Sequence, residues 1–139
     1  MTDAVPEAEV KPTEEQIARL VRLFYERARQ EERLGPLFAR MVSDWEGHFV
    51  IVQDFWSHIL LGTGRYKGSP FAPHMQMPIE LEHFDRWLGL FRQTAVEVLP
   101  PDAAKLAIAR AEHMTKSFRM GLFPWIGPNG QPLRHKPKV

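Results

Sequence analysis

Apolar residues recur at three- and four-residue steps in four stretches of the chain, which is the spacing of one buried face of an α-helix. The first stretch follows residues 13–16, whose sequence TEEQ is a capping box, and it predicts a helix that runs to about Gln30. Residues 34–36, with the sequence LGP, interrupt the pattern because glycine and proline disfavour a continuing helix. Residues 37–41 predict one short helical turn.

The second stretch predicts a helix that begins at residues 43–46, again a capping sequence, and ends at the glycines of residues 62–64. Its apolar face is unusually rich in aromatic side chains. This face consists of Trp45, Phe49, Val52, Phe55, Trp56, Ile59 and Leu60. Residues 65–78 hold several prolines and glycines, so they predict a loop with at most one short, irregular helix.

The remaining two stretches predict a third helix from about Glu80 to Val98 and a fourth from the prolines at 100 and 101 to Gly121. The predicted inward faces are Leu81, Phe84, Leu88, Phe91, Ala95 and Val98 in the third helix, and Leu106, Ala109, His113, Met114 and Phe118 in the fourth. Together the four helices predict an all-α domain at residues 13–121. A flexible lead-in of residues 1–12 and an irregular basic tail of residues 122–139 are expected on either side.

The composition narrows the classes of function. The 139 residues suffice for one domain, and 18 Lys or Arg against 17 Asp or Glu give a net charge of +1. This balance argues against binding of nucleic acid or an anionic membrane through bulk charge. The chain has no cysteine, which excludes disulfides and thiol nucleophiles and leaves only nitrogen and oxygen ligands for a metal. Because the sequence shows neither a signal peptide nor an apolar run of roughly 18 residues, we expect a cytoplasmic protein without a membrane span.

The six histidines are the candidate metal ligands, and four of them have ordinary structural interpretations. His58 follows Asp54 by four residues, which is the spacing of a surface pair on a helix. Glu80 and His83 have the ExxH spacing of non-haem di-iron bundles, but that chemistry needs a second copy, which the sequence lacks. His113 is expected at a core boundary, and the last histidine lies in the tail.

The other two histidines have different surroundings. His48 is early in the aromatic-rich helix and can face the same volume as Val52 and Phe55. His74 lies in the proline-rich segment, with no carboxylate nearby in the sequence. Haem iron requires an axial imidazole on one side and a controlled pocket on the other, and this pair of histidines could supply both. An aromatic core with histidines at its rim explains the same pattern, so both interpretations stay open on spacing alone.

Several separated motifs together resemble the group III truncated haemoglobins. The motifs are residues 23–25 (LFY), 34–38 (LGPLF), 45–48 (WxxH), 55–56 (FW), 66–74 (YxGxPxxxH) and 83–91 (HFxxWLxLF). They occur in the order and spacing of this bacterial family, and the resemblance covers roughly residues 13 to 120. It implies a two-over-two helical globin fold that binds haem b, whereas the proline-rich basic tail after Gly121 is longer than the resemblance explains.

The resemblance also implies roles for individual residues. His74 matches the proximal ligand of the iron, and Tyr25, His48 and Trp87 match the polar groups on the ligand side. Donors such as the Tyr25 hydroxyl and the Trp87 indole N–H stabilise bound dioxygen more than carbon monoxide, because dioxygen acquires more negative charge. The expected apolar contacts of the porphyrin are Phe24, Val52, Phe55, Phe84, Trp87, Phe91, Met114 and Phe118.

The expected function is reversible binding of dioxygen and other diatomic ligands, including carbon monoxide, nitric oxide and cyanide, at a pentacoordinate histidine-ligated iron. An unidentified reductase is the expected partner, and the balanced surface charge indicates a monomer or weak dimer. The nearest alternative is a haem-dependent redox enzyme, either peroxidase-like or acting on nitric oxide and oxygen. Two alternatives without haem remain: a helical interaction module and the non-haem di-iron bundle.

Overall fold

The computed structural model describes residues 11–137, except for the side chain of Ala72. The first ten residues of the expected lead-in and the last two of the tail therefore lie outside the described residues. The elements are α1 (Glu14–Gln30), α2 (Leu34–Met41), α3 (Trp45–Leu61), α4 (Phe71–His74), α5 (Leu81–Val98), α6 (Pro101–Leu122), β1 (Trp125–Ile126) and β2 (Pro132–Leu133). Helices dominate these elements, so the all-α prediction is confirmed.

Capping residues determine where the long helices begin and end. Thr13 accepts a hydrogen bond from the backbone N–H of Gln16, and the Gln16 side chain accepts one from the backbone of Thr13, so the predicted capping box is confirmed. At α3 the cap is Asp44, whose carboxylate accepts from the backbone N–H of Gly47. Gly62 ends α3 with φ 68°, a left-handed conformation that glycine adopts without strain.

The short helix α2 begins earlier than the sequence pattern predicts. Leu34, Gly35 and Pro36 form its first turn, whereas the pattern places a break there. Proline is compatible with a first turn because the backbone N–H that it lacks has no partner within the helix. The carboxylate of Glu31 accepts a hydrogen bond from the backbone N–H of Leu34, 3.1 Å away. The interruption of the helix therefore falls at residues 31–33.

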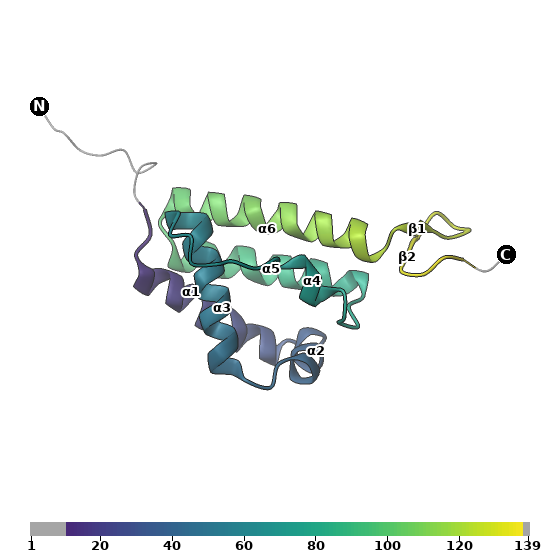
Figure 1. The fold of residues 1–139 in the computed structure, drawn as a ribbon, viewed down its shortest axis with the longest axis horizontal. Helices are drawn as coiled ribbons and strands as arrows, with labels where there is room; N and C mark the ends of the chain where they lie inside the picture. Colours follow the sequence, from purple (N-terminus) through teal and green to yellow (C-terminus); the bar gives the residue numbers. More distant parts are fainter. Residues whose placement is uncertain (1–10, 138–139) are drawn as a thin grey trace, which may run out of the picture.

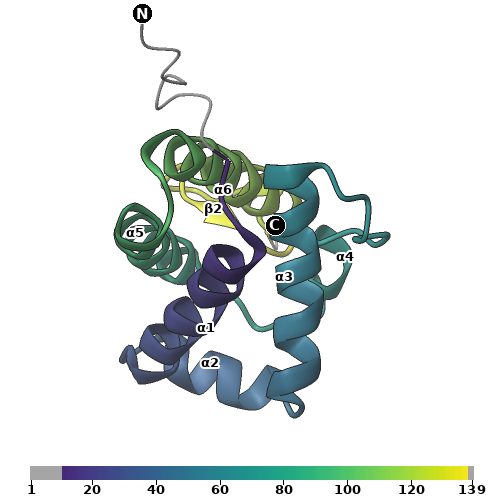
Figure 2. The ribbon, with the colours of Figure 1, turned by 90° about the vertical axis from the view of Figure 1, so that its left-hand side faces the viewer.

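Two pairs of long helices cross each other. Helices α5 and α6 pack side by side and run antiparallel, joined by residues 99–100, while α1 and α3 form the second pair (Figure 1). Between the pairs, α1 packs on α5 and α3 packs on α6. Figure 2 looks nearly along α5 and α6 and shows α4 farther from the viewer than α3. This is the two-over-two arrangement that the resemblance implies.

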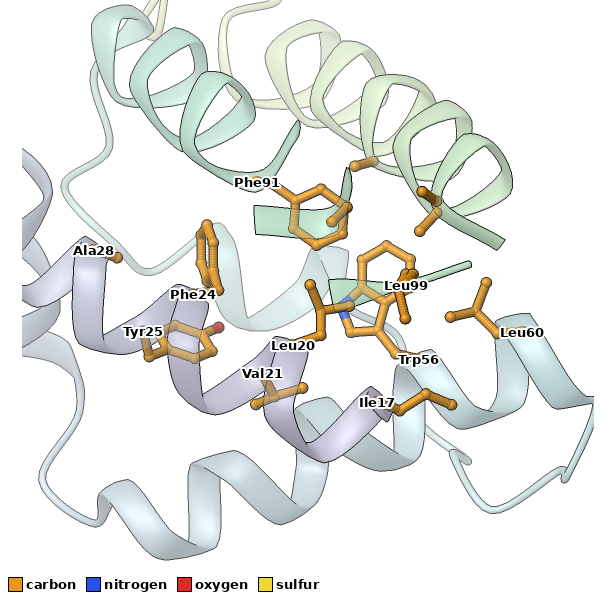
Figure 3. Close-up of a cluster of buried hydrophobic side chains, with 14 of the residues drawn as sticks. Ile17, Leu20, Val21, Phe24, Tyr25, Ala28, Trp56, Leu60, Phe91 and Leu99 are labelled. Atoms are coloured by element: carbon orange, nitrogen blue, oxygen red, sulfur yellow. The ribbon is translucent and has the colours of Figure 1, made fainter. Parts of the chain in front are cut away.

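The main core lies where these two pairs of helices meet. Ile17 and Leu20 of α1 are fully buried, and Trp56 of α3 stacks on Phe91 of α5 with ring centroids 4.9 Å apart (Figure 3). Burial of each large apolar side chain contributes about 1.5–3 kcal/mol to folding. Trp56 and Phe91 were both predicted to face inward, and the structure confirms this prediction.

The buried face of α6 matches the predicted one only in part, since Phe118 is buried and Met114 is half-buried, as predicted. Leu106, Ala109 and His113 were expected inward and are exposed. The buried residues are Ala103, Ala104, Ala107, Ala111, Thr115, Phe118 and Leu122. Apart from Phe118 and Leu122 these side chains are small, which allows α6 to pack closely on the neighbouring helices, whereas the sequence pattern favoured larger apolar residues. As in the other described helices, α6 lacks the combination of length and apolar character needed to cross a membrane.

The proline-rich segment contains α4, which is the one short helix that the sequence predicts there. Phe71 of α4 packs against Phe118 of α6, with ring centroids 5.6 Å apart. Ile79, just after the segment, is buried as well. We use the name "second core cluster" for the buried residues Leu37, Ile79, Phe84, Phe118 and Leu122. The segment thus packs against the second core cluster through Phe71.

The tail after α6, expected to be irregular, folds into a small hairpin. Strands β1 and β2 pair antiparallel, with Trp125 opposite Leu133. The ammonium group of Lys136 lies 5.9 Å from the centroid of the Trp125 ring. Each strand has two residues, which is too short for the alternating pattern that identifies strands in a sequence. The side chain of Arg134 reaches back from this hairpin to the segment after α4.

Candidate functional site

His74 is the last residue of α4, and its ring lies against the second core cluster. Its Nδ1 atom is in contact with the carbonyl oxygen of Pro70, four residues earlier, and its ring centroid is 4.7 Å from that of Phe118. Burial lowers the pKa of His74, and the contact with the Pro70 carbonyl opposes this shift. A neutral imidazole that donates through Nδ1 keeps the Nε2 lone pair available for a metal ion.

His48 lies in the first turns of α3 and points into the interior. Its ring centroid is 4.9 Å from that of Tyr25, and its Nε2 atom is buried without a hydrogen-bond partner among the described residues. Burial lowers the pKa of His48, and the nearby charge of His74 lowers this pKa further. The two histidines lie on different helices, His48 on α3 and His74 on α4.

Tyr25 is the centre of an aromatic cluster on the inner side of α1. Its ring centroid lies 5.4 Å from that of Phe38 and 5.9 Å from that of Phe49. Burial raises the pKa of the Tyr25 hydroxyl, so the hydroxyl stays protonated at neutral pH. Tyr25 can therefore donate a hydrogen bond beside the ring of His48.

Trp87 reaches the same region from α5. Its ring stacks on that of Phe91, with centroids 5.2 Å apart and planes within 5°, and it contacts Phe24 at 5.4 Å. Phe24 also contacts Tyr25 at 5.1 Å. The structure thus brings Tyr25 and His48 into direct contact, and it separates Trp87 from Tyr25 by one phenylalanine ring.

The expected apolar contacts of the porphyrin lie on several sides of the interior. Phe24 and Phe91 are buried in the main core, Trp87 packs against that core, Val52 and Phe55 are half-buried on α3, Phe84 and Phe118 belong to the second core cluster, and Met114 contacts both clusters. Helix α3 therefore leaves a large part of its aromatic face only half-covered by other described side chains.

Two residues of this site, Trp45 and Pro70, were not predicted from the sequence. Trp45 was interpreted as core packing only, yet it is half-buried, and its ring centroid lies 5.6 Å from that of Tyr25 and 5.8 Å from that of His48. The three-residue spacing of Trp45 and His48 was the signal, because residues so spaced are neighbours on a helix. The Pro70 carbonyl could not be identified from the sequence, because a backbone partner depends on the path of the chain.

The remaining histidines of the described residues have other surroundings. His83 accepts a hydrogen bond at Nδ1 from the backbone N–H of Glu80, 2.8 Å away, so the ExxH spacing forms part of the cap of α5. His58 is exposed on α3, as expected for a surface residue. His113, expected at a core boundary, is exposed because it lies outside the buried face of α6.

Comparisons with known proteins agree on one family. The sequence model of the bacterial-like globins matches residues 12–120. The group 3 truncated hemoglobin of Campylobacter jejuni is 31% identical over 119 residues, which is 82% of this chain and 94% of that protein. The crystal structure of the group III truncated hemoglobin from Campylobacter jejuni superposes with a TM-score of 0.70 and 29% identity, over 84% of this chain and 91% of that one. The resemblance stated from the motifs and the expected two-over-two globin fold are thereby confirmed.

Proposed function

We propose that this chain, a member of the bacterial-like globin family, binds haem and ligates its iron through Nε2 of His74. The observation that carries this proposal is the pair of interior histidines. Nδ1 of His74 contacts a backbone carbonyl, which leaves its Nε2 free for a metal, and Nε2 of His48 is buried without a hydrogen-bond partner among the described residues. This arrangement fits haem, whose iron needs one histidine ligand from the protein and a pocket in which a small molecule can bind.

The side chains around His74 also fit haem better than a bare metal ion. The described residues contain no cluster of three or more His, Cys, Asp or Glu side chains that could hold a metal ion. A metal at His74 therefore needs most of its ligands from another molecule, which a porphyrin supplies. We propose haem b, because thioether attachment requires cysteine and the chain has none. The apolar residues described above would contact the porphyrin.

The polar side chains of Tyr25, Trp87 and His48 would determine which small molecule binds best. When bound, haem supplies an iron atom that takes up a diatomic molecule such as dioxygen, carbon monoxide, nitric oxide or cyanide. The Tyr25 hydroxyl and the Trp87 indole N–H would donate hydrogen bonds to this molecule, favouring dioxygen over carbon monoxide because bound dioxygen acquires more negative charge. The lowered pKa keeps His48 neutral at pH 7, so it adds a polar group without a charge.

The first experiment is a hemin titration followed by absorption spectroscopy. We expect a sharp Soret band in the ferric protein, which shifts on reduction with dithionite and again under carbon monoxide. In His74→Gly the band should fall sharply and recover in part when imidazole is added, since imidazole fills the space of the missing ligand. The control His113→Gly changes an exposed histidine and should bind hemin as the parent does. A folded parent protein that leaves hemin free and aggregated would overturn the proposal and favour an interaction module.

The role of Tyr25 is tested by the release of dioxygen from the reduced protein. We expect Tyr25→Phe to release dioxygen roughly 10 to 100 times faster, because a hydrogen bond to a charged acceptor contributes about 1.5–3 kcal/mol. The control is Tyr66→Phe, since Tyr66 packs on Phe55 and is the other tyrosine of the chain. Stopped-flow mixing of each oxygenated protein with carbon monoxide measures its rate of dioxygen release. Equal release rates in the parent and in Tyr25→Phe would contradict this role.

A further inference from the structure

The segment that follows His74 is hydrogen-bonded to the C-terminal hairpin. Arg134, at the end of this hairpin, donates from Nη2 to the carbonyl of Met75 over 2.8 Å and from Nη1 to the carbonyl of Ile79 over 3.1 Å. One guanidinium group thus connects the residue directly after His74 with the residue that precedes the cap of α5. The planar fork of arginine fits two such acceptors at once.

The helix that carries His74 cannot hold the ring in place by itself. Helix α4 has four residues, and so short a helix is not stable on its own. Its position depends on contacts with the C-terminal part of the chain. Phe118 of α6 packs on both Phe71 and His74, and a Cβ atom added at Gly121 would overlap the Phe71 ring. Arg134 supplies the corresponding support on the other side of His74 along the chain.

The hairpin has the internal bonds of a defined structure. The backbone N–H of Gly127 donates to the carbonyl of Gln131 over 2.8 Å, and that of Gly130 donates to the carbonyl of Gly127 over 2.9 Å. Gly130 has φ 77°, which few other residues adopt in a tight turn. The hairpin therefore holds Arg134 in a defined position. All of these residues follow position 120, where the match to the family model ends.

We propose that Arg134 is a positioning residue for His74, through which the C-terminal hairpin sets the orientation of the axial imidazole. The guanidinium group acts through the carbonyls of Met75 and Ile79 and does not touch the imidazole itself. This inference rests on the proposed ligation of haem iron by His74. It assigns the C-terminal hairpin a role in the site.

The test compares Arg134→Gln and Arg134→Lys with the parent protein loaded with haem. Resonance Raman spectroscopy of the reduced protein measures the iron–histidine stretching band, and an excess of apomyoglobin measures haem loss. We expect Arg134→Gln to shift or broaden this band and to lose haem roughly tenfold faster, which is within the range for residues that orient a metal ligand. Arg134→Lys should be intermediate, because a single ammonium group cannot reproduce the rigid fork.

The control is Arg92→Gln, which removes an exposed ion pair with Glu112 and should leave the band and the loss rate unchanged. Far-UV circular dichroism checks that each variant keeps its helices. A band and loss rate in Arg134→Gln equal to those of the parent would overturn the inference.

A second measurement does not depend on haem. Amide hydrogen exchange of the haem-free protein should be faster between Met75 and Ile79 in Arg134→Gln than in Arg92→Gln. If the parent binds no hemin, the proposed function fails even though this exchange difference persists. If the parent binds hemin but the exchange is equal in both variants, only the role of Arg134 fails.

Discussion

At the residue scale, two glycines on the neighbouring helices α5 and α6 have opposite surroundings. A Cβ atom added at Gly89 meets nothing within 4 Å, whereas one added at Gly121 would overlap the ring of Phe71. We expect Gly89→Ala to raise the free energy of unfolding by about 0.5–1 kcal/mol through helix propensity alone. Gly121→Ala should instead lower it by roughly 1 kcal/mol, because the ring must move. Urea unfolding measures both, and a stabilised Gly121→Ala variant would show that Phe71 does not occupy this contact.

Single residues of the candidate site differ in how far the sequence could predict them. His48 and His74 could be selected because their neighbours, an aromatic helix face and a proline-rich segment, are visible in the sequence. The partner of His74 could not, because the Pro70 carbonyl is a backbone atom that every residue possesses. The buried, unpartnered Nε2 of His48 likewise appears only when the surrounding helices are in place.

At the scale of elements, the interface of α5 and α6 depends on the small residues of α6. Ala111 is fully buried, whereas Ala109 is exposed on the same helix. We expect Ala111→Leu to lower the free energy of unfolding by about 1–3 kcal/mol, because additional methyl groups must push the helices apart. Ala109→Leu, with the same change in helix propensity, should alter it by less than about 0.5 kcal/mol. Equal effects in thermal unfolding would place both alanines in the same environment, contrary to the observed packing.

A polar network connects the start of α1 with the end of α3. The carboxylate of Glu14 accepts hydrogen bonds from the Ser57 hydroxyl and, over 2.7 Å, from Arg65, which also pairs with Asp54. The bond from Ser57, followed by that from Arg65, holds the pKa of Glu14 below its ordinary value of 4.5. The folded state therefore favours the carboxylate, and this stabilisation is present above pH 4.5 and is lost as the pH falls through the lowered pKa.

We expect Glu14→Gln to lower the free energy of unfolding by roughly 0.5–1 kcal/mol at pH 7. The difference from the parent should shrink as the pH falls below 4.5 and should be lost once the pH passes the lowered pKa of Glu14, since the folded parent then binds the proton as well. Glu15→Gln changes an exposed carboxylate in the same helical turn and serves as the control. Urea titrations at a series of pH values give the comparison. A difference that stays constant down to pH 3 would mean that the charge of Glu14 does not stabilise the fold.

The long helices could be predicted because their capping sequences and three- to four-residue periodicity are local properties. The buried face of α6 could not, because alanine occurs on either side of a helix and its burial depends on the approach of α5. The hairpin after α6 escaped prediction for a related reason. Two-residue strands are fixed by tertiary contacts such as those of Arg134, and no sequence window contains those contacts.

At the scale of the whole molecule, the half-covered aromatic face of α3 leads us to expect that stability depends on the proposed cofactor. A ligand that binds only the folded state adds about 1.4 kcal/mol to the free energy of unfolding for each tenfold excess over its dissociation constant. We therefore expect the urea midpoint of the parent to rise with hemin concentration, and that of His74→Gly to rise much less. Far-UV circular dichroism monitors the transition. A midpoint that is independent of hemin in a protein with a Soret band would indicate binding outside the helical core.

The overall arrangement could be predicted only with the help of the family resemblance. Four amphipathic helices alone are compatible with several bundles, and their spacing in the sequence does not decide which pairs cross. The separated motifs removed this ambiguity because they fix the order of the elements from residue 13 to residue 120. The segment beyond residue 120 had no such guide, and there the structure departs most from the expectation.

The placement of the four tryptophans has an optical consequence. Trp45, Trp56 and Trp87 lie in or against the main core, whereas Trp125 is 41% exposed on the hairpin. Indole emits at longer wavelength in water than in an apolar interior, and haem absorbs the emission of nearby indoles. The long-wavelength part of the emission should therefore report the surroundings of Trp125 in the hairpin. The short-wavelength part, which comes from the core tryptophans, should lose intensity when haem binds. A single fluorescence spectrum of the unlabelled protein thus distinguishes a movement of the hairpin from the binding of haem.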